Sequence, residues 1–178
     1  RRDESGDQQQ LKEYDIPQID LVIVDLYPFE ETVLSGASEQ EIIEKIDIGG
    51  ISLIRAGAKN YNDVLVVASR EQYADLLSLL EESEGTSTLE QRRTFARQAF
   101  NVSSHYDSEI FKYFDKDEMT ALKLSEKNAK VLRYGENPHQ TGAVYENSSE
   151  SGAMNSFEQI HGKELSYNNY KDMDIAWK

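Results

Sequence analysis

The chain has 178 residues, of which 38% are hydrophobic, and its formal net charge at pH 7 is −14. A charge of this size repels nucleic-acid phosphates and anionic membrane surfaces, so we expect neither nucleic acid nor a membrane as a partner. The absence of cysteine excludes disulfides, thiolate catalysis and cysteine-built zinc sites, and the absence of a long apolar run or a signal-peptide pattern indicates a cytoplasmic protein.

The first half of the chain alternates between helical and extended patterns. Leu21–Val24 and Val64–Ala68 are short, continuous apolar runs, which are typical of strands buried on both faces of a parallel sheet. Ser38 and Glu41 form a capping-box pattern that predicts the start of a helix. The expected elements, in chain order, are a short helix at 8–14, a strand at 21–24, helices over 39–46 and about 50–58, and a strand at 64–68. This alternation predicts an α/β layer fold.

The second half begins with helical patterns and then becomes irregular. Capping-box patterns at 69–72 and 88–91 predict a helix to about residue 81 and a long helix to residue 114. The long helix carries an apolar stripe at three- and four-residue steps, and a core and a subunit contact are both open interpretations of it. The stripe comprises Phe95, Ala99, Val102, Tyr106, Ile110 and Phe114. The later expectations are a charged connector at 115–130, a strand at 143–145 and a helix from 172.

Polar residues follow the first expected strand at the point where it ends. Asp25 and Tyr27 come directly after Leu21–Val24. Open α/β sheets bind ligands outside the carboxyl ends of their strands. We therefore expect a polar residue and a tyrosine at this position to face a substrate.

The segment IDIGGISLIRAGAKN at 46–60 concentrates polar and flexible residues around one expected helix start. Asp47 precedes Gly49 and Gly50, where the backbone can approach a ligand closely and helix N–H groups point outward. Such donors suit a phosphate or an oxyanion. Lys59 closes the segment near the expected end of the helix. A turn and a charge that complements the helix dipole are the simpler explanations of the same residues.

Two further blocks lie near the carboxyl end of the chain, LRYGENPHQ at 132–140 and GKELSYNN at 162–169. With DLVIVDLYPF at 20–29 and the 46–60 segment, they resemble the bifunctional family of late purine biosynthesis, phosphoribosylaminoimidazolecarboxamide formyltransferase / IMP cyclohydrolase. The resemblance implies that 1–125 belongs to a methylglyoxal-synthase-like parallel-sheet cyclohydrolase domain whose N-terminal part is missing. It implies that 131–178 begins a second α/β domain, the formyltransferase. The chain is then expected to be an internal fragment.

The resemblance also implies the activities and their ligands. The cyclohydrolase converts 5-formamidoimidazole-4-carboxamide ribotide to IMP and needs neither cofactor nor metal. The formyltransferase takes its formyl group from 10-formyltetrahydrofolate, at a site that is expected to lie mostly outside this chain. The family resemblance further implies a homodimer whose partners are purine ribotides. The alternative that remains open is a non-catalytic fragment or degenerate homologue that acts as an assembly module.

The resemblance assigns roles to individual residues. Lys59 is expected to polarise or protonate the developing oxyanion, Asp47 to orient the carboxamide or relay its proton, and Tyr27 to supply a hydroxyl. The expected ribotide contacts are Val24, Asp25, Ile48, Gly49, Gly50 and Ser52 in the cyclohydrolase, and Arg133, Tyr134 and Asn169 in the formyltransferase. The catalytic lysine–histidine pair of the formyltransferase lies beyond Lys178 in the family pattern, and His105, His139 and His161 are not expected to replace it.

Two positions depart from the family pattern. Asp25 stands where the family commonly has asparagine, and a carboxylate cannot donate a hydrogen bond as an amide does. Gly57 stands where alanine is usual, which lowers helix stability by about 1 kcal/mol. A further difficulty is geometric: a helix over 50–58 separates its ends by roughly 12 Å. Lys59 and Asp47 therefore meet only if the lysine reaches back or the helix bends at Gly57.

Overall fold

The structure is a computed structural model that describes residues 2–126, 129–145 and 157–177. The chain divides into two compact units, Arg1–Lys123 and Leu124–Lys178. The first unit contains α1 (Ser5–Glu13), β1 (Leu21–Ile23), α2 (Phe29–Leu34), α3 (Glu39–Glu44), α4 (Gly49–Lys59), β2 (Leu65–Val67), the short 3₁₀ helix η1 (Arg70–Gln72), α5 (Tyr73–Glu82) and α6 (Leu89–Phe114). The second contains β3 (Ala129–Val131), β4 (Ala143–Tyr145) and α7 (Tyr167–Trp177).

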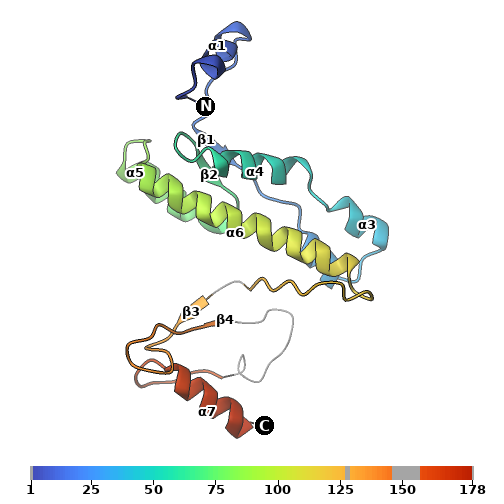
Figure 1. The fold of residues 1–178 in the computed structure, drawn as a ribbon, viewed down its shortest axis with the longest axis vertical. Helices are drawn as coiled ribbons and strands as arrows, with labels where there is room; N and C mark the ends of the chain where they lie inside the picture. Colours follow the sequence, from blue (N-terminus) through green and yellow to red (C-terminus); the bar gives the residue numbers. More distant parts are fainter. Residues whose placement is uncertain (1, 127–128, 146–156, 178) are drawn as a thin grey trace. The chain divides into compact units, whose positions relative to one another are not determined.

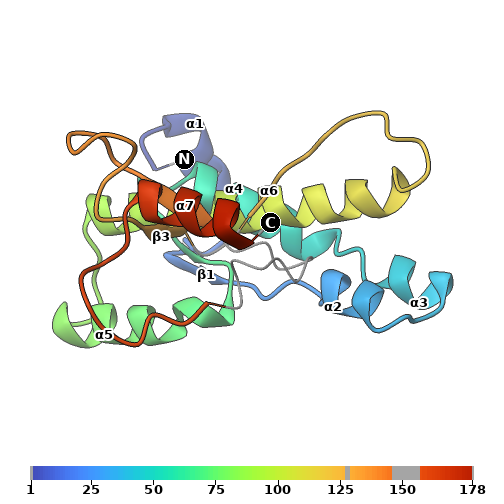
Figure 2. The same ribbon diagram turned by 90° about the horizontal axis from the view of Figure 1, so that it is seen from below.

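The first unit is built around a parallel pair of strands. β1 pairs with β2 in the register Leu21 to Leu65 and Ile23 to Val67. Figure 2 shows these strands between α5 on one side and α4 with α6 on the other. The expected α/β layer is thus present as a small parallel sheet covered by helices on both faces (Figure 1).

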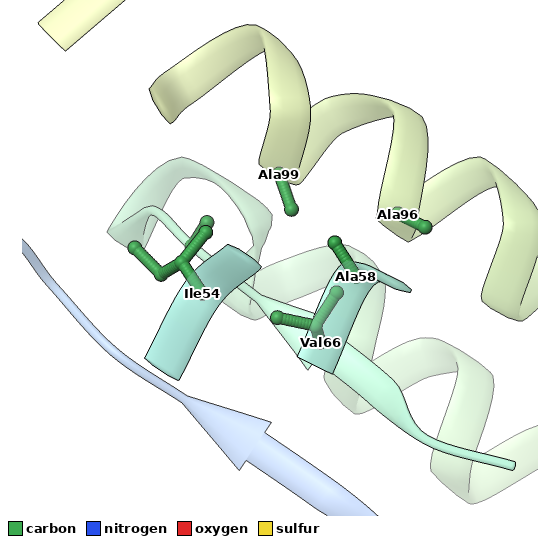
Figure 3. Close-up of a cluster of buried hydrophobic side chains, with 6 residues drawn as sticks. Ile54, Ala58, Val66, Ala96 and Ala99 are labelled. Carbon is green, nitrogen blue, oxygen red and sulfur yellow. The ribbon is translucent and has the colours of Figure 1, made fainter. Parts of the chain in front are cut away.

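Alternate residues of β2 and its continuation supply the two halves of the core, because successive side chains of a strand point to opposite faces. Val66 and Ala68 pack against α4 and α6, and Figure 3 shows Val66 directed toward side chains of both helices. Those helix side chains are Ile54, Ala58, Ala96 and Ala99. Leu65 and Val67 instead pack against α5. β2 is buried throughout, as its apolar run predicts.

Gly57 lies inside α4 and faces β2. A Cβ atom at this position would lie 3.2 Å from Cγ2 of Val66 and 3.7 Å from Cβ of Val22. α4 remains helical through this glycine to Lys59. The glycine therefore permits a close approach of helix and strand.

A third apolar cluster joins α2 and α3 to the far half of α6. Phe29, Ile42 and Tyr106 are its buried members. The rings of Phe29 and Tyr106 meet edge to face with their centroids 6.2 Å apart. The stripe predicted along α6 is therefore core over most of its length, whereas Phe114 at the end of the helix is 58% exposed.

Two of the three predicted capping boxes are confirmed. The capping boxes at Ser38 and Thr88 are present and start α3 and α6. The one expected at Ser69 is wrong: Ser69 caps the 3₁₀ helix through the Glu71 amide. Gln72 instead turns inward, where its side chain accepts from the Ala68 amide and donates to Gln98.

Three other expectations for the elements need correction. β1 is not buried on both faces, because Ile23 is 47% exposed. α2 was not expected, and it begins directly after Pro28, whose carbonyl accepts from the hydroxyl of Thr32. α7 starts at Tyr167 rather than at residue 172, because Ser166 and Asn169 form a polar helix start.

The second unit contains an antiparallel pair of strands and one helix. Ala129 pairs with Tyr145, and Val131 pairs with Ala143. The expected strand at 143–145 is therefore confirmed. The segment between the strands folds back on itself, with a hydrogen bond of 2.7 Å from the Gly135 amide to the Gln140 carbonyl. Among the described residues, no helix has the length and apolar character needed to cross a membrane.

Candidate functional site

The chain that leaves β1 carries three of the candidate residues, Val24, Asp25 and Tyr27, at the carboxyl edge of the parallel sheet. Val24 still belongs to the ladder, because its amide donates to the carbonyl of Val67 at 2.9 Å. Tyr27 is 56% exposed, and the ammonium of Lys45 lies 5.6 Å from the centroid of its ring. The phenol of Tyr27 is therefore accessible beside a cation.

Asp25 is held by two donors that follow β2. Its Oδ2 accepts from Nε of Arg70 at 3.1 Å and from the hydroxyl of Tyr73 at 2.7 Å. The hydrogen bond to Asp25 is the main cause that raises the pKa of Tyr73. Oδ1 of Asp25 is buried and has no hydrogen-bond partner among the described residues. A buried carboxylate oxygen without a donor is costly, and it marks a position where a ligand N–H or O–H can bind.

Asp47 starts α4 from just outside the helix. Its Oδ1 accepts from the Gly50 amide at 2.6 Å. The same carboxylate covers Gly50, where an added Cβ would lie 2.6 Å from Oδ2. Gly49, by contrast, has open space around the position of a Cβ atom. The two glycines therefore have different roles. Gly50 leaves room for the carboxylate of Asp47, and Gly49 leaves the helix start uncovered.

This arrangement changes the expected use of the helix N-terminus. The Gly50 amide, which the sequence predicts as a donor to a phosphate or oxyanion, already donates to Asp47. A carboxylate beside the helix start also repels a second anion. Ile48 is 73% exposed, and the hydroxyl of Ser52 donates to its carbonyl at 2.8 Å. Ser52 is therefore engaged within the helix.

The backbone before α4 is tied to α6 by Tyr106. Its hydroxyl donates to the carbonyl of Lys45 at 2.6 Å and accepts from the Asp47 amide at 2.8 Å. Burial is the main cause that raises the pKa of Tyr106, so the phenol stays protonated at neutral pH. The sequence predicts Tyr106 only as an apolar stripe residue. Its helical spacing carries no signal for the two hydrogen bonds.

Lys59 lies at the other end of α4. The helix spans Gly49–Lys59, which separates its ends by about 15 Å along the axis. A turn over residues 60–64 joins α4 to the amino end of β2, whereas Asp25 and Tyr27 follow the carboxyl end of β1. α4 stays helical through Gly57. Within the described part of the chain, Lys59 is not brought together with Tyr27 and Asp47.

The candidates in the second unit form one cluster of side chains. The guanidinium of Arg133 lies 4.8 Å from the ring centroid of Tyr134 and donates to its hydroxyl at 3.2 Å. Hydrogen bonds from Ser166, and then from Arg133, lower the pKa of Tyr134. Asn169 accepts from the amide and the hydroxyl of Ser166, each at 3.0 Å. Asn169 therefore stabilises the start of α7, and the buried Ser166 is a member of the cluster that the sequence did not indicate.

The histidines and metal chemistry complete the description of the site. His105 is buried on α6, and its Nε2 lies 3.2 Å from Oε2 of Glu30 on α2, so it links two helices. His139 and His161 are exposed. Over residues 2–126, 129–145 and 157–177, no three histidine or carboxylate side chains are grouped to hold a metal ion.

Comparison with known proteins gives consistent results along the chain. The family model described as AICARFT/IMPCHase bienzyme matches residues 57–178. A Bacteroides thetaiotaomicron protein named "Bifunctional purine biosynthesis protein PurH" is 64% identical over 176 residues, which cover 99% of this chain and 34% of that protein. A protein of the same name from Clostridium acetobutylicum is 45% identical over 178 residues, 99% of this chain and 36% of that protein.

A solved structure is also similar. The structure entitled "Crystal structure of ForH" superposes on this chain with a TM-score of 0.52 and 31% sequence identity. The superposed region covers 63% of this chain and 58% of that chain. The chain spans about a third of the length of the curated relatives that it matches. Because the family model matches well over half of the residues, the chain belongs to the AICARFT/IMPCHase bienzyme family.

Proposed function

We propose that this chain is part of a bifunctional enzyme of late purine biosynthesis. One activity closes the ring of 5-formamidoimidazole-4-carboxamide ribotide to give IMP, and the other transfers a formyl group from 10-formyltetrahydrofolate to the aminoimidazole carboxamide ribotide. The observation that carries the proposal is the 64% identity, along 99% of this chain, to a protein named as a bifunctional purine biosynthesis protein. At this level of identity the ligand-contacting residues are expected to be shared.

The two activities are proposed to map onto different parts of the chain. We assign residues 1–125 to a methylglyoxal-synthase-like cyclohydrolase domain and 131–178 to the beginning of the formyltransferase domain. The division of the structure into units at Lys123 and Leu124 supports this assignment. A homodimer and a cytoplasmic location belong to the same proposal, and the homodimer rests on the family resemblance alone.

Ring closure depends mainly on how the two reacting groups of the substrate are positioned. The carboxamide nitrogen attacks the formyl carbon of the same molecule, and a C–N bond forms. The C–O bond of the formyl group then breaks, and its oxygen leaves as water with one proton from the carboxamide nitrogen and one from the formamido nitrogen, which forms a C=N bond to the same carbon. An enzyme accelerates such a step by holding the two groups together and by moving protons between them. No cofactor enters this balance.

The carboxyl edge of the parallel sheet offers suitable groups for this step. Oδ1 of Asp47 is fixed by the Gly50 amide, which leaves Oδ2 to accept an N–H of the carboxamide. The exposed phenol of Tyr27 can donate to the formyl oxygen as it leaves. Oδ1 of Asp25 is a second acceptor at the same edge of the sheet. We therefore propose Asp47 and Tyr27 as catalytic residues and Asp25 as a contact to the ribotide.

In the second unit, Arg133 and Tyr134 are proposed as contacts to the ribotide of the formyltransferase. A guanidinium suits a two-pronged grip on a phosphate, and it is exposed here. The hydroxyl oxygen of Tyr134 accepts a hydrogen bond from Arg133, whose guanidinium also lies over the ring, so part of its capacity for a donor on the ligand is used. Its ring face and its proton are what it can offer to a substrate.

A second candidate function has specific support. Asp47 and Asn169 both stabilise helix starts, and Lys59 lies far from Asp47, so these residues also have purely structural explanations. A non-catalytic assembly module would need no more than these contacts. The exposed Tyr27 and the partnerless Oδ1 of Asp25 favour the enzyme, because neither stabilises the fold.

The test is ring closure by the protein expressed from its complete reading frame. Formation of IMP from the formylated ribotide is followed by absorbance for the wild type, Asp47→Asn and Ser38→Ala. Asp47→Asn keeps the acceptor for the Gly50 amide but removes the charge, and we expect turnover to fall by about a hundredfold. Ser38→Ala removes a helix cap outside the site and should leave turnover unchanged. A wild type without activity would refute the enzyme and support the assembly module.

A further inference from the structure

The segment that carries Asp47 is held by a residue far along the chain. Tyr106 lies on α6, and its hydroxyl bridges the carbonyl of Lys45 and the amide of Asp47, at 2.6 Å and 2.8 Å. The hydroxyl thus donates its proton to the residue before Ile46 and accepts a hydrogen bond from the residue after it. These two contacts fix the backbone between α3 and α4 at the residue that precedes the helix start.

The position of the hydroxyl is itself determined by packing. Tyr106 is 9% exposed, and its ring meets Phe29 edge to face. Phe29, the first residue of α2, is 2% exposed and belongs to the same apolar cluster. The tyrosine ring therefore has little freedom to move, and its hydroxyl holds the 45–47 backbone against a rigid core.

The bridge connects both residues that we propose as catalytic. It sets the backbone of Asp47, whose carboxylate then reaches the Gly50 amide. It also sets the backbone of Lys45, whose ammonium lies 5.6 Å from the ring centroid of Tyr27. A shift of the 45–47 segment would therefore displace the carboxylate of Asp47 and the cation beside Tyr27 together.

We propose that Tyr106 is a positioning residue for ring closure, which acts through the backbone of Lys45 and Asp47 and does not touch the substrate. This inference rests on the proposed cyclohydrolase function. It predicts that loss of one buried hydroxyl reduces turnover, because a displacement of about 1 Å in a catalytic group can cost on the order of a hundredfold in rate.

The decisive variant is Tyr106→Phe in the protein from the complete reading frame, because it keeps the ring and removes only the hydroxyl. We expect kcat for IMP formation to fall by at least about tenfold while KM changes by less than about threefold. Tyr113→Phe is the matched control. Tyr113 lies on the same helix and its ring also meets Phe29, at 5.9 Å, but among the described residues its hydroxyl has no hydrogen bond. An equal loss in both variants would overturn the proposal.

A double-mutant cycle separates positioning from general loss of stability. If Tyr106 acts through Asp47, its replacement should matter little once the carboxylate is gone. In an Asp47→Asn background, we therefore expect Tyr106→Phe to lower kcat by less than about threefold, because residues that act as a unit are strongly non-additive. The same fold loss in both backgrounds would show that Tyr106 does not work through Asp47.

Hydrogen exchange distinguishes failure of this inference from failure of the proposed function. We expect amides in the 45–50 segment to exchange faster in Tyr106→Phe than in the wild type, and to be unchanged in Tyr113→Phe. An unchanged rate in Tyr106→Phe would overturn the positioning role even in an active enzyme. Faster exchange in Tyr106→Phe, together with a wild type that forms no IMP, would instead confirm the contact and refute the cyclohydrolase function.

Discussion

Replacement of Gly49 and Gly50 by alanine, one at a time, tests how the start of α4 is built. Both residues are helical and adjacent, so helix propensity alone predicts the same effect for both. The structure predicts different effects. A Cβ atom at Gly49 meets open space, whereas one at Gly50 lies 2.6 to 2.9 Å from the carboxylate of Asp47.

The magnitudes follow from two opposing contributions. Alanine in place of glycine at a compatible helical site stabilises by about 0.4–1 kcal/mol, which is the expectation for Gly49→Ala. Gly50→Ala gains a similar amount but forces the side chain of Asp47 to rotate away from the Gly50 amide. Loss of such a helix-start hydrogen bond costs typically about 1 kcal/mol. Gly50→Ala is therefore close to neutral, and the two variants should differ by about 1 kcal/mol.

Thermal unfolding measures this difference directly. A change of 1 kcal/mol corresponds to about 2–4 °C in Tm for a protein of this size, so Gly49→Ala should melt higher than Gly50→Ala by that interval. Turnover in IMP formation should fall only in Gly50→Ala, because only that variant displaces Asp47. Equal melting temperatures together with equal turnover would refute the carboxylate position.

Three further predictions concern separate parts of the chain. Asp25→Asn should weaken IMP binding in titration calorimetry, because its amide oxygen would stay on the same two donors and its NH₂ would replace the partnerless oxygen that is proposed to accept from the ligand; maintained or tighter binding would refute that contact. Gly57→Ala should lower the free energy of unfolding by up to about 2 kcal/mol, because crowding of Val66 by the new Cβ costs about 1–3 kcal/mol while helix propensity returns about 1 kcal/mol, and in a Val66→Ala background the same change should be stabilising. Ser166→Ala should raise the pKa of Tyr134 in an ultraviolet titration, because it removes the hydrogen bond that is the main cause of the lowered pKa; an unchanged pKa would contradict that hydrogen bond.

The elements that the sequence predicted correctly are those specified by local chemistry. β2 is a continuous apolar run that is buried throughout, and the Thr88 capping box starts α6 through contacts three residues apart. The same logic failed at Ser69, because the chain tightens into a 3₁₀ turn and Gln72 bonds to α6 instead. A pattern of residue types cannot reveal such a competing partner.

The site was predictable only in part, because its geometry depends on contacts that are distant in sequence. The sequence placed Asp47 at a helix start and Tyr27 after a strand, and both positions are correct. It could not show that Tyr106 holds the backbone amide of Asp47, since 59 positions separate the two residues. Ser166 was missed for a related reason: its importance comes from burial next to Tyr134 and not from a motif.

The family resemblance and the geometry of this chain disagree on the role of Lys59. The resemblance assigns it to the developing oxyanion, and loss of such a partner predicts a fall in turnover of at least about a hundredfold for Lys59→Ala. In the structure, Lys59 ends α4 beside the amino edge of β2, whereas the cation near Tyr27 is Lys45. A lysine at the far end of an eleven-residue helix cannot span the distance by itself.

Parallel assays of Lys59→Ala and Lys45→Ala decide between these assignments. A hundredfold loss confined to Lys59→Ala would mean that its ammonium meets the ribotide from a direction that the geometry of α4 alone does not provide. A larger loss in Lys45→Ala would refute the role carried over to Lys59. The ammonium of Lys45, whose backbone carbonyl Tyr106 holds in place, would then be the cation for the leaving oxygen. The side chains proposed to act in ring closure would all lie on the 45–47 segment and Tyr27.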